Sequence, residues 1–207
     1  MKKIISLFLA ILMALPVFAG GNDYRKKVRE LKRGKWELYN STQTLESALK
    51  RHYEALDREG VYEISGTAEG VRSSGLGMQV AAHNASIRYV TQVGQFLRGR
   101  IASDAQSGGD ARDEFNHFYA AYESLLQKEI GGELRHSFTL VRPGKKRGTL
   151  EMVSYFIVDE EQASRARIKA LELAASESAA AQRMAESIRT YVDEGFAPVD
   201  DNTLTAE

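Results

Sequence analysis

Apolar residues recur along the chain with two different periods, and each period predicts its own kind of element. Residues 22–35 carry a thin apolar stripe among many cations, and residues 40–60 place leucines and Tyr53 on one helical face, so both segments are predicted helices. Residues 61–70 instead alternate with period two, and Ile64 and its alternate neighbours on one side predict a half-buried strand.

Helical spacing returns after this strand. Apolar and small residues from Met78 to Phe96 predict a long helix, and residues 115–131 predict a second amphipathic helix that ends at two glycines. A capping pattern at Asp159 then predicts a last, alanine-rich helix that runs on to about Val192.

Residues 133–159 predict a β-hairpin. Both arms alternate and flank a turn that contains Pro143, Gly144 and Gly148. The residues expected to share one face on each arm are Leu134, His136, Phe138 and Leu140, and Leu150, Met152, Ser154 and Phe156.

The order of these elements predicts an α+β protein with a small, mainly antiparallel sheet of about three strands and several helices packed on one face. We expect four parts: a signal peptide at 1–19, a basic helical segment at 20–35, a single α+β domain at 36–195 and a flexible acidic tail at 196–207. A Rossmann fold is excluded, because strands and helices do not alternate regularly.

The first residues have the pattern of an export signal. Lys2 and Lys3 precede an apolar run that is too short to span a bilayer, and small residues up to Ala19 offer a cleavage site. We therefore expect an exported protein, periplasmic in its location, with no integral membrane segment after cleavage.

The amino-acid composition excludes several kinds of site and partner. The chain has no cysteine, which excludes disulfides, thiolate metal sites, a cysteine nucleophile and a lipid anchor on cysteine. The 28 basic residues balance 28 acidic ones, so nothing draws the whole chain toward nucleic acid, and nucleic acid is not an expected partner.

The sequence contains no complete motif of a known catalytic site. The glycines between Gly66 and Gly77 match neither a phosphate-binding loop nor a dinucleotide fingerprint, and residues 47–50 match SxxK without its companion motifs. The four histidines have no metal-ligand spacing, although His83 beside a carboxylate of a neighbouring helix remains an alternative. We expect no catalytic residue, no cofactor and no metal, and we expect the glycines to form a structural joint.

Two clusters of basic residues are the candidate binding sites. One lies in the first predicted helix and the other at the hairpin turn, and together they comprise Arg25, Lys26, Lys27, Arg29, Lys32, Arg33, Arg142, Lys145, Lys146 and Arg147. Because the chain as a whole is neutral, these local groups of positive charge favour an envelope protein or an anionic envelope polymer as partner. The alternative is that both clusters are simply solvated surfaces without a partner.

The linear order of motifs also carries a resemblance. Trp36, then TLESAL, then YEISGTAEG, a long alanine-bearing helix, a basic hairpin and a terminal alanine-rich helix resemble an uncharacterised exported family of Bacteroidetes-type bacteria. More remotely, the chain resembles the Lpp-twenty-like lipoproteins and the N-terminal domain of the flagellar assembly protein FlgT. The resemblance implies a scaffold or assembly role without catalytic residues, and the anchoring cysteine of the lipoproteins is absent.

Three functions follow as hypotheses. The first is a non-enzymatic exported interaction or assembly protein. The second is a small-ligand binding domain with a pocket between sheet and long helix, and the third is a hydrolase of unrecognised type. The residues expected to line the pocket of the second are Tyr62, Tyr89, Phe118, Phe138 and Tyr155.

Overall fold

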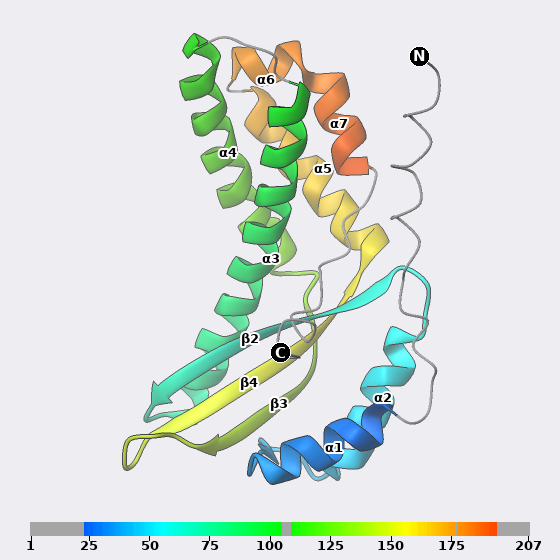
Figure 1. Cartoon of the computed structure of the whole chain (residues 1–207), viewed down its shortest axis with the longest axis vertical. Coiled ribbons are helices and arrows are strands. Elements are labelled where there is room, and N and C mark those ends of the chain that lie inside the picture. The colour runs from blue at the N-terminus through cyan, green and yellow to red at the C-terminus, as the bar shows by residue number, and fades with distance from the viewer. Residues whose placement is uncertain (1–22, 105–108, 177, 194–207) are drawn as a thin grey trace, which may run out of the picture.

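The computed structural model describes residues 23–104, 109–176 and 178–193 (Figure 1). The predicted signal peptide and acidic tail lie outside the described residues. The elements are α1 (Asp23–Arg33), β1 (Glu37–Leu38), α2 (Leu45–Leu56), β2 (Val61–Val71), α3 (Ser74–Asp104), α4 (Gly109–Ile130), β3 (Arg135–Pro143), β4 (Leu150–Asp159), α5 (Glu160–Ser176), α6 (Ala179–Arg183) and α7 (Ala185–Asp193).

The strands form a four-stranded antiparallel sheet in the order β1-β3-β4-β2. The α+β class and the predicted hairpin are therefore confirmed. The strand beyond the three expected is β1, whose Glu37 and Leu38 pair with Val141 and Leu140. Two residues are too few to show an alternating pattern, so this strand could not be predicted from periodicity.

One face of the sheet packs on α3. Ile64 and Ala68 of β2 point toward this helix and are buried, and Gly66 between them lies directly against its backbone. Above them, Ile64 and the β4 residues Phe156 and Val158 join side chains of α3, α4, α5 and α7 in the main core. Figure 1 shows these helices as a bundle that extends from one end of the sheet.

The opposite face is covered by α1 and α2, so the helices are not confined to one face as predicted. Val28, Leu31 and Leu49 of these helices pack on Phe138 and Leu140 of β3. The reason is a shift of register between His136 and Phe138, which turns Phe138 and Leu140 away from the α3 face. The alternation predicted for this arm is therefore broken at Ser137, and both faces of the sheet carry apolar side chains.

The predicted last helix is divided into α5, α6 and α7. Ser178 starts α6 by accepting a hydrogen bond from the Ala181 amide at 3.2 Å, and Met184 leaves helical geometry before α7 begins. The chain thereby turns back, and α7 packs on α5 and α3 (Figure 1). An alanine-rich run gives little indication of such a break, because alanine fits a helix equally well on either side of it.

Across the part of the chain that the structure describes, no helix combines the length and the apolar character needed to cross a bilayer.

Candidate functional site

Helix α1 presents most of its cations to solvent. Val28 and Leu31 are buried against the sheet, and this fixes which side of the helix faces outward. Within the described residues, no acidic side chain forms an ion pair with any of the predicted cations of this helix. Exposed are Arg25, Lys26, Arg29, Lys32 and Arg33, whereas Lys27 is half-buried.

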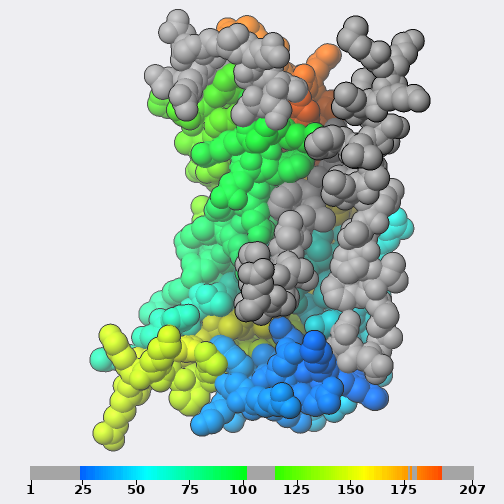
Figure 2. Space-filling model, in the orientation of Figure 1, coloured from blue at the N-terminus to red at the C-terminus, as the bar shows by residue number. Residues whose placement is uncertain are grey.

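The hairpin turn carries the second group of cations. The Gly144 amide donates to the Thr149 carbonyl at 2.8 Å, the Thr149 hydroxyl donates to the Lys146 carbonyl at 2.7 Å, and Gly148 takes a φ of 75°. These contacts hold the turn in one shape, and Lys145, Lys146 and Arg147 are exposed on it. Figure 2 shows the turn as the yellow-green projection at the lower left of the molecule.

Arg142 joins the two groups. Its guanidinium binds the Glu151 carboxylate at 2.6 Å and lies 4.4 Å from the centre of the Trp36 ring. It also donates to the Gly34 carbonyl, directly after α1, at 3.4 Å. Arg142 is thus engaged within the fold, unlike the exposed cations around it, and it brings two basic segments that are 108 residues apart in the chain next to each other.

A hydrogen-bonded chain that the sequence did not indicate lies under α2. His52 Nδ1 is 2.9 Å from the Ser137 hydroxyl, and its Nε2 is 2.5 Å from the Glu63 carboxylate. Serine, histidine and carboxylate are the residue types of a nucleophile, a base and an orienting acid. The His52 side chain is, however, 0% exposed and lies edge-on to Phe138 and Tyr155.

These hydrogen bonds attach α2 to the sheet. His52 belongs to α2, Glu63 to β2 and Ser137 to β3, so the two hydrogen bonds hold the helix against two strands. Sequence could have shown only that His52 falls near the apolar face of its helix, because the partners come from strands that the register shift positions.

The other histidines do not gather carboxylates. His83 and His117 are exposed, and His136 contacts the Thr139 hydroxyl at 2.8 Å and the Phe156 ring. Burial lowers the pKa of His136. Within the described ranges, no cluster of three or more His, Cys, Asp or Glu residues is arranged to hold a metal ion.

A second buried polar group lies between the sheet and the bundle. Arg167 of α5 is 1% exposed; it forms an ion pair with Glu160 and donates to the Tyr89 hydroxyl at 2.7 Å. Burial alone lowers the pKa of Arg167, but the hydrogen bonds to Glu160 and Tyr89 outweigh it and raise this pKa overall. Burial also raises the pKa of Tyr62, which lies beside Tyr89.

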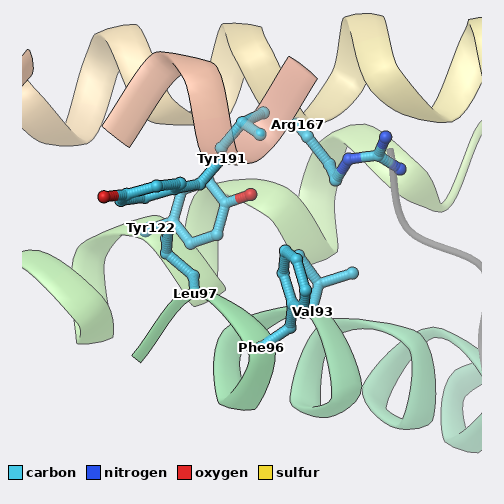
Figure 3. A pocket seen from close by; sticks show the side chains of 7 residues that line it. Val93, Phe96, Leu97, Tyr122, Arg167 and Tyr191 are labelled. Atoms are coloured by element: carbon cyan, nitrogen blue, oxygen red, sulfur yellow. The ribbon is translucent and has the colours of Figure 1, made fainter. Parts of the chain in front are cut away.

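The cavity next to Arg167 is small. It lies between α3, α4, α5 and α7 (Figure 3) and has a volume of about 10 Å³, roughly the room that one water molecule needs. Its lining consists of Val93, Phe96, Leu97, Tyr122, Arg167, Tyr191 and Val192.

The five aromatic residues predicted to line a ligand pocket are divided by the sheet. Tyr62, Tyr89 and Phe118 pack in the main core, whereas Phe138 and Tyr155 pack under α1 and α2 on the other face. The prediction that these five residues line one cavity is therefore wrong. Two causes separate them: the register shift in β3 turns Phe138 to the α1–α2 face, and Tyr155 points to that face because it alternates with Ser154 and Phe156 along β4.

Two candidate sites thus remain. One is the set of exposed cations on α1 and on the hairpin turn, and the other is the hydrogen-bonded group of Ser137, His52 and Glu63. Comparisons with protein-family models, with curated proteins and with solved structures found no match for this chain.

Proposed function

We propose that the protein is an exported, non-enzymatic binding protein that holds an anionic component of the cell envelope on its basic surface. We define the basic surface as the exposed cations of α1 together with Lys145, Lys146 and Arg147 of the hairpin. The observation that carries the proposal is the contact of Arg142 with Gly34, which brings the base of the hairpin turn to the residue directly after α1.

The charges of this surface are not balanced locally. Residues 23–35 hold seven basic and two acidic residues, and residues 142–149 hold four basic residues and no acidic one. Exposed cations that have no acidic partner attract anions over about 10 Å at moderate salt. An envelope location for the partner rests on the predicted export signal and on the resemblance to exported families.

The binding test compares sedimentation of the purified chain, starting at Gly20, with washed envelope fragments. We expect replacement of Lys145, Lys146 and Arg147 by alanine to weaken binding at least ten-fold, since each cation near an anionic surface contributes about 1 kcal/mol. Binding should also weaken as salt is raised.

A matched control removes three exposed cations from the other end of the sheet, Arg58, Lys128 and Arg135. This variant should sediment like the unaltered chain. Equal binding by the hairpin variant and the unaltered chain would sink the proposal.

The non-enzymatic part of the proposal has its own test. A fluorophosphonate reacts with a serine hydroxyl that a neighbouring base activates. We expect no labelling of Ser137, because the His52 ring that would act as base is enclosed by aromatic side chains. Labelling that disappears in a His52→Ala variant would show a working serine–histidine pair and contradict the proposal.

A further inference from the structure

We propose that the anionic component is a lipid bilayer surface, and that the protein docks on it through one end of its sheet. This inference rests on the proposed function and names its partner. The surface, here called the sheet tip, consists of Arg72, Leu76, Met78, Lys145, Lys146 and Arg147.

Strand pairing brings these residues together. Val71 at the end of β2 and Pro143 at the end of β3 both pair with Leu150 of β4. Arg72 therefore lies at the same end of the sheet as the hairpin turn, and α3 starts directly after it. In Figure 1 the start of α3, the end of β2 and the turn lie together at the lower left.

The sheet tip exposes apolar side chains beside its cations. Leu76 is 54% exposed and Met78 is 38% exposed, although both are large and apolar. Gly77 between them is buried against Val71 and Met152, which turns the two side chains outward on either side of it. Among the described residues, only Ile87 and Leu173 are large apolar side chains of similar exposure.

The cations of the sheet tip are available to a partner. Arg72, Lys145, Lys146 and Arg147 are exposed, and within the described part of the chain none forms an ion pair. The amino end of α3 adds a partial positive charge at the same place. Glu151, the acidic residue on β4 nearest the turn, is already bound by Arg142.

This combination favours a bilayer over a soluble polyanion. A polyanion offers only charge, and it leaves Leu76 and Met78 in water. A bilayer with anionic lipids offers phosphates to the cations and acyl chains to the two apolar side chains within a few ångströms. The attachment that we infer is peripheral, since it uses exposed side chains of the sheet tip.

The test measures binding of the chain from Gly20 to vesicles of phosphatidylglycerol and phosphatidylethanolamine, with phosphatidylcholine vesicles and soluble polyphosphate as comparisons. We expect binding to the anionic vesicles and not to the neutral ones. Replacement of Leu76 and Met78 by serine should weaken vesicle binding about ten-fold and leave polyphosphate binding unchanged. The matched control replaces Ile87 and Leu173 by serine, and it should bind vesicles like the unaltered chain.

The outcomes separate the two proposals. Absence of binding to anionic vesicles, or equal vesicle binding by the Leu76/Met78 variant and the unaltered chain, overturns the lipid inference. If the same protein still sediments with envelope fragments through Lys145, Lys146 and Arg147, the proposed function stands with a different partner. Loss of both activities overturns both.

Discussion

At the scale of single residues, Gly66 shows how the fold limits substitution. A Cβ atom at this position would lie 2.0 Å from the Ala81 carbonyl oxygen and 2.5 Å from the Ala85 amide nitrogen. Both atoms belong to the backbone of α3, so no side-chain rotation relieves the overlap. The contact between β2 and α3 therefore depends on the missing side chain, as expected for a structural joint.

We expect Gly66→Val to lower the free energy of unfolding by about 3 kcal/mol or more, because α3 has to move away from the sheet. Thermal unfolding followed by circular dichroism measures the change. Gly75→Ala is the control: a Cβ there meets nothing nearer than the Ser73 hydroxyl at 4.0 Å, so stability should stay equal or rise slightly. A Gly66→Val protein as heat-stable as the original contradicts this account.

Arg167 is a second residue whose replacement should lower stability, because its side chain is buried. We expect Arg167→Met to cost about 3 kcal/mol, because it leaves Glu160 and the Tyr89 hydroxyl without their buried partner. The control is Arg165→Met two positions earlier, since Arg165 is 67% exposed and pairs with Glu161 only at the surface. Its removal should change stability by less than about 1 kcal/mol.

Urea unfolding at neutral pH measures both arginine variants. Equal midpoints for the two variants would show that the buried ion pair contributes no more than the exposed one.

At the scale of elements, the position of α2 depends on its contacts with β3 of the hairpin and with the edge strand β2. Its buried residues are Ala48, Leu49 and His52, and the His52 ring is hydrogen-bonded to side chains of two strands. A short helix with so few buried apolar side chains gains most of its stability from tertiary contacts. The His52 chain is therefore better explained as the attachment of α2 than as a reaction centre.

We expect His52→Ala to cost about 3 kcal/mol, through the cavity left among the aromatic rings and the loss of both hydrogen bonds. Hydrogen exchange should speed up first at the amides of α2. His83→Ala, at an exposed position on α3, is the control and should leave exchange unchanged. Unaltered protection of α2 in the His52 variant would refute its role.

At the scale of the whole molecule, buried tyrosines tie stability to alkaline pH. Burial raises the pKa of Tyr62, Tyr89, Tyr119, Tyr122 and Tyr155. These hydroxyls stay protonated in the folded protein above about pH 10, whereas the unfolded chain releases their protons there. The unfolded state then binds fewer protons, so stability is full below about pH 10 and falls as pH rises further.

Tyr122→Phe tests this dependence. The Tyr122 hydroxyl is buried and has no hydrogen-bond partner among the described residues, so its removal should cost little at neutral pH. Denaturant unfolding measured from neutral pH to about pH 11 should show a smaller alkaline loss for the variant than for the original. Identical alkaline losses in the two proteins would contradict the assignment.

Hydrophobic periodicity determined the kind and order of the main elements: the β2 strand, the long helix α3 and the β3–β4 hairpin lie where their patterns predict them, although the faces of β3 do not follow its predicted alternation throughout. These features are local, since each follows from spacing within one segment. Composition likewise identified the two groups of cations. The division of the last helix and the two-residue strand β1 left no such local pattern.

Only the tertiary structure decided which elements and side chains contact one another. The shift of register at Ser137 put Phe138 on the α1–α2 face, away from Tyr62, Tyr89 and Phe118, and brought Ser137 to His52. Strand pairing set the start of α3 at the same end of the sheet as the hairpin turn, and Arg142 joined the base of that turn to the end of α1. These contacts link residues far apart in sequence. Periodicity within one segment cannot predict them, because they depend on the register and packing between elements.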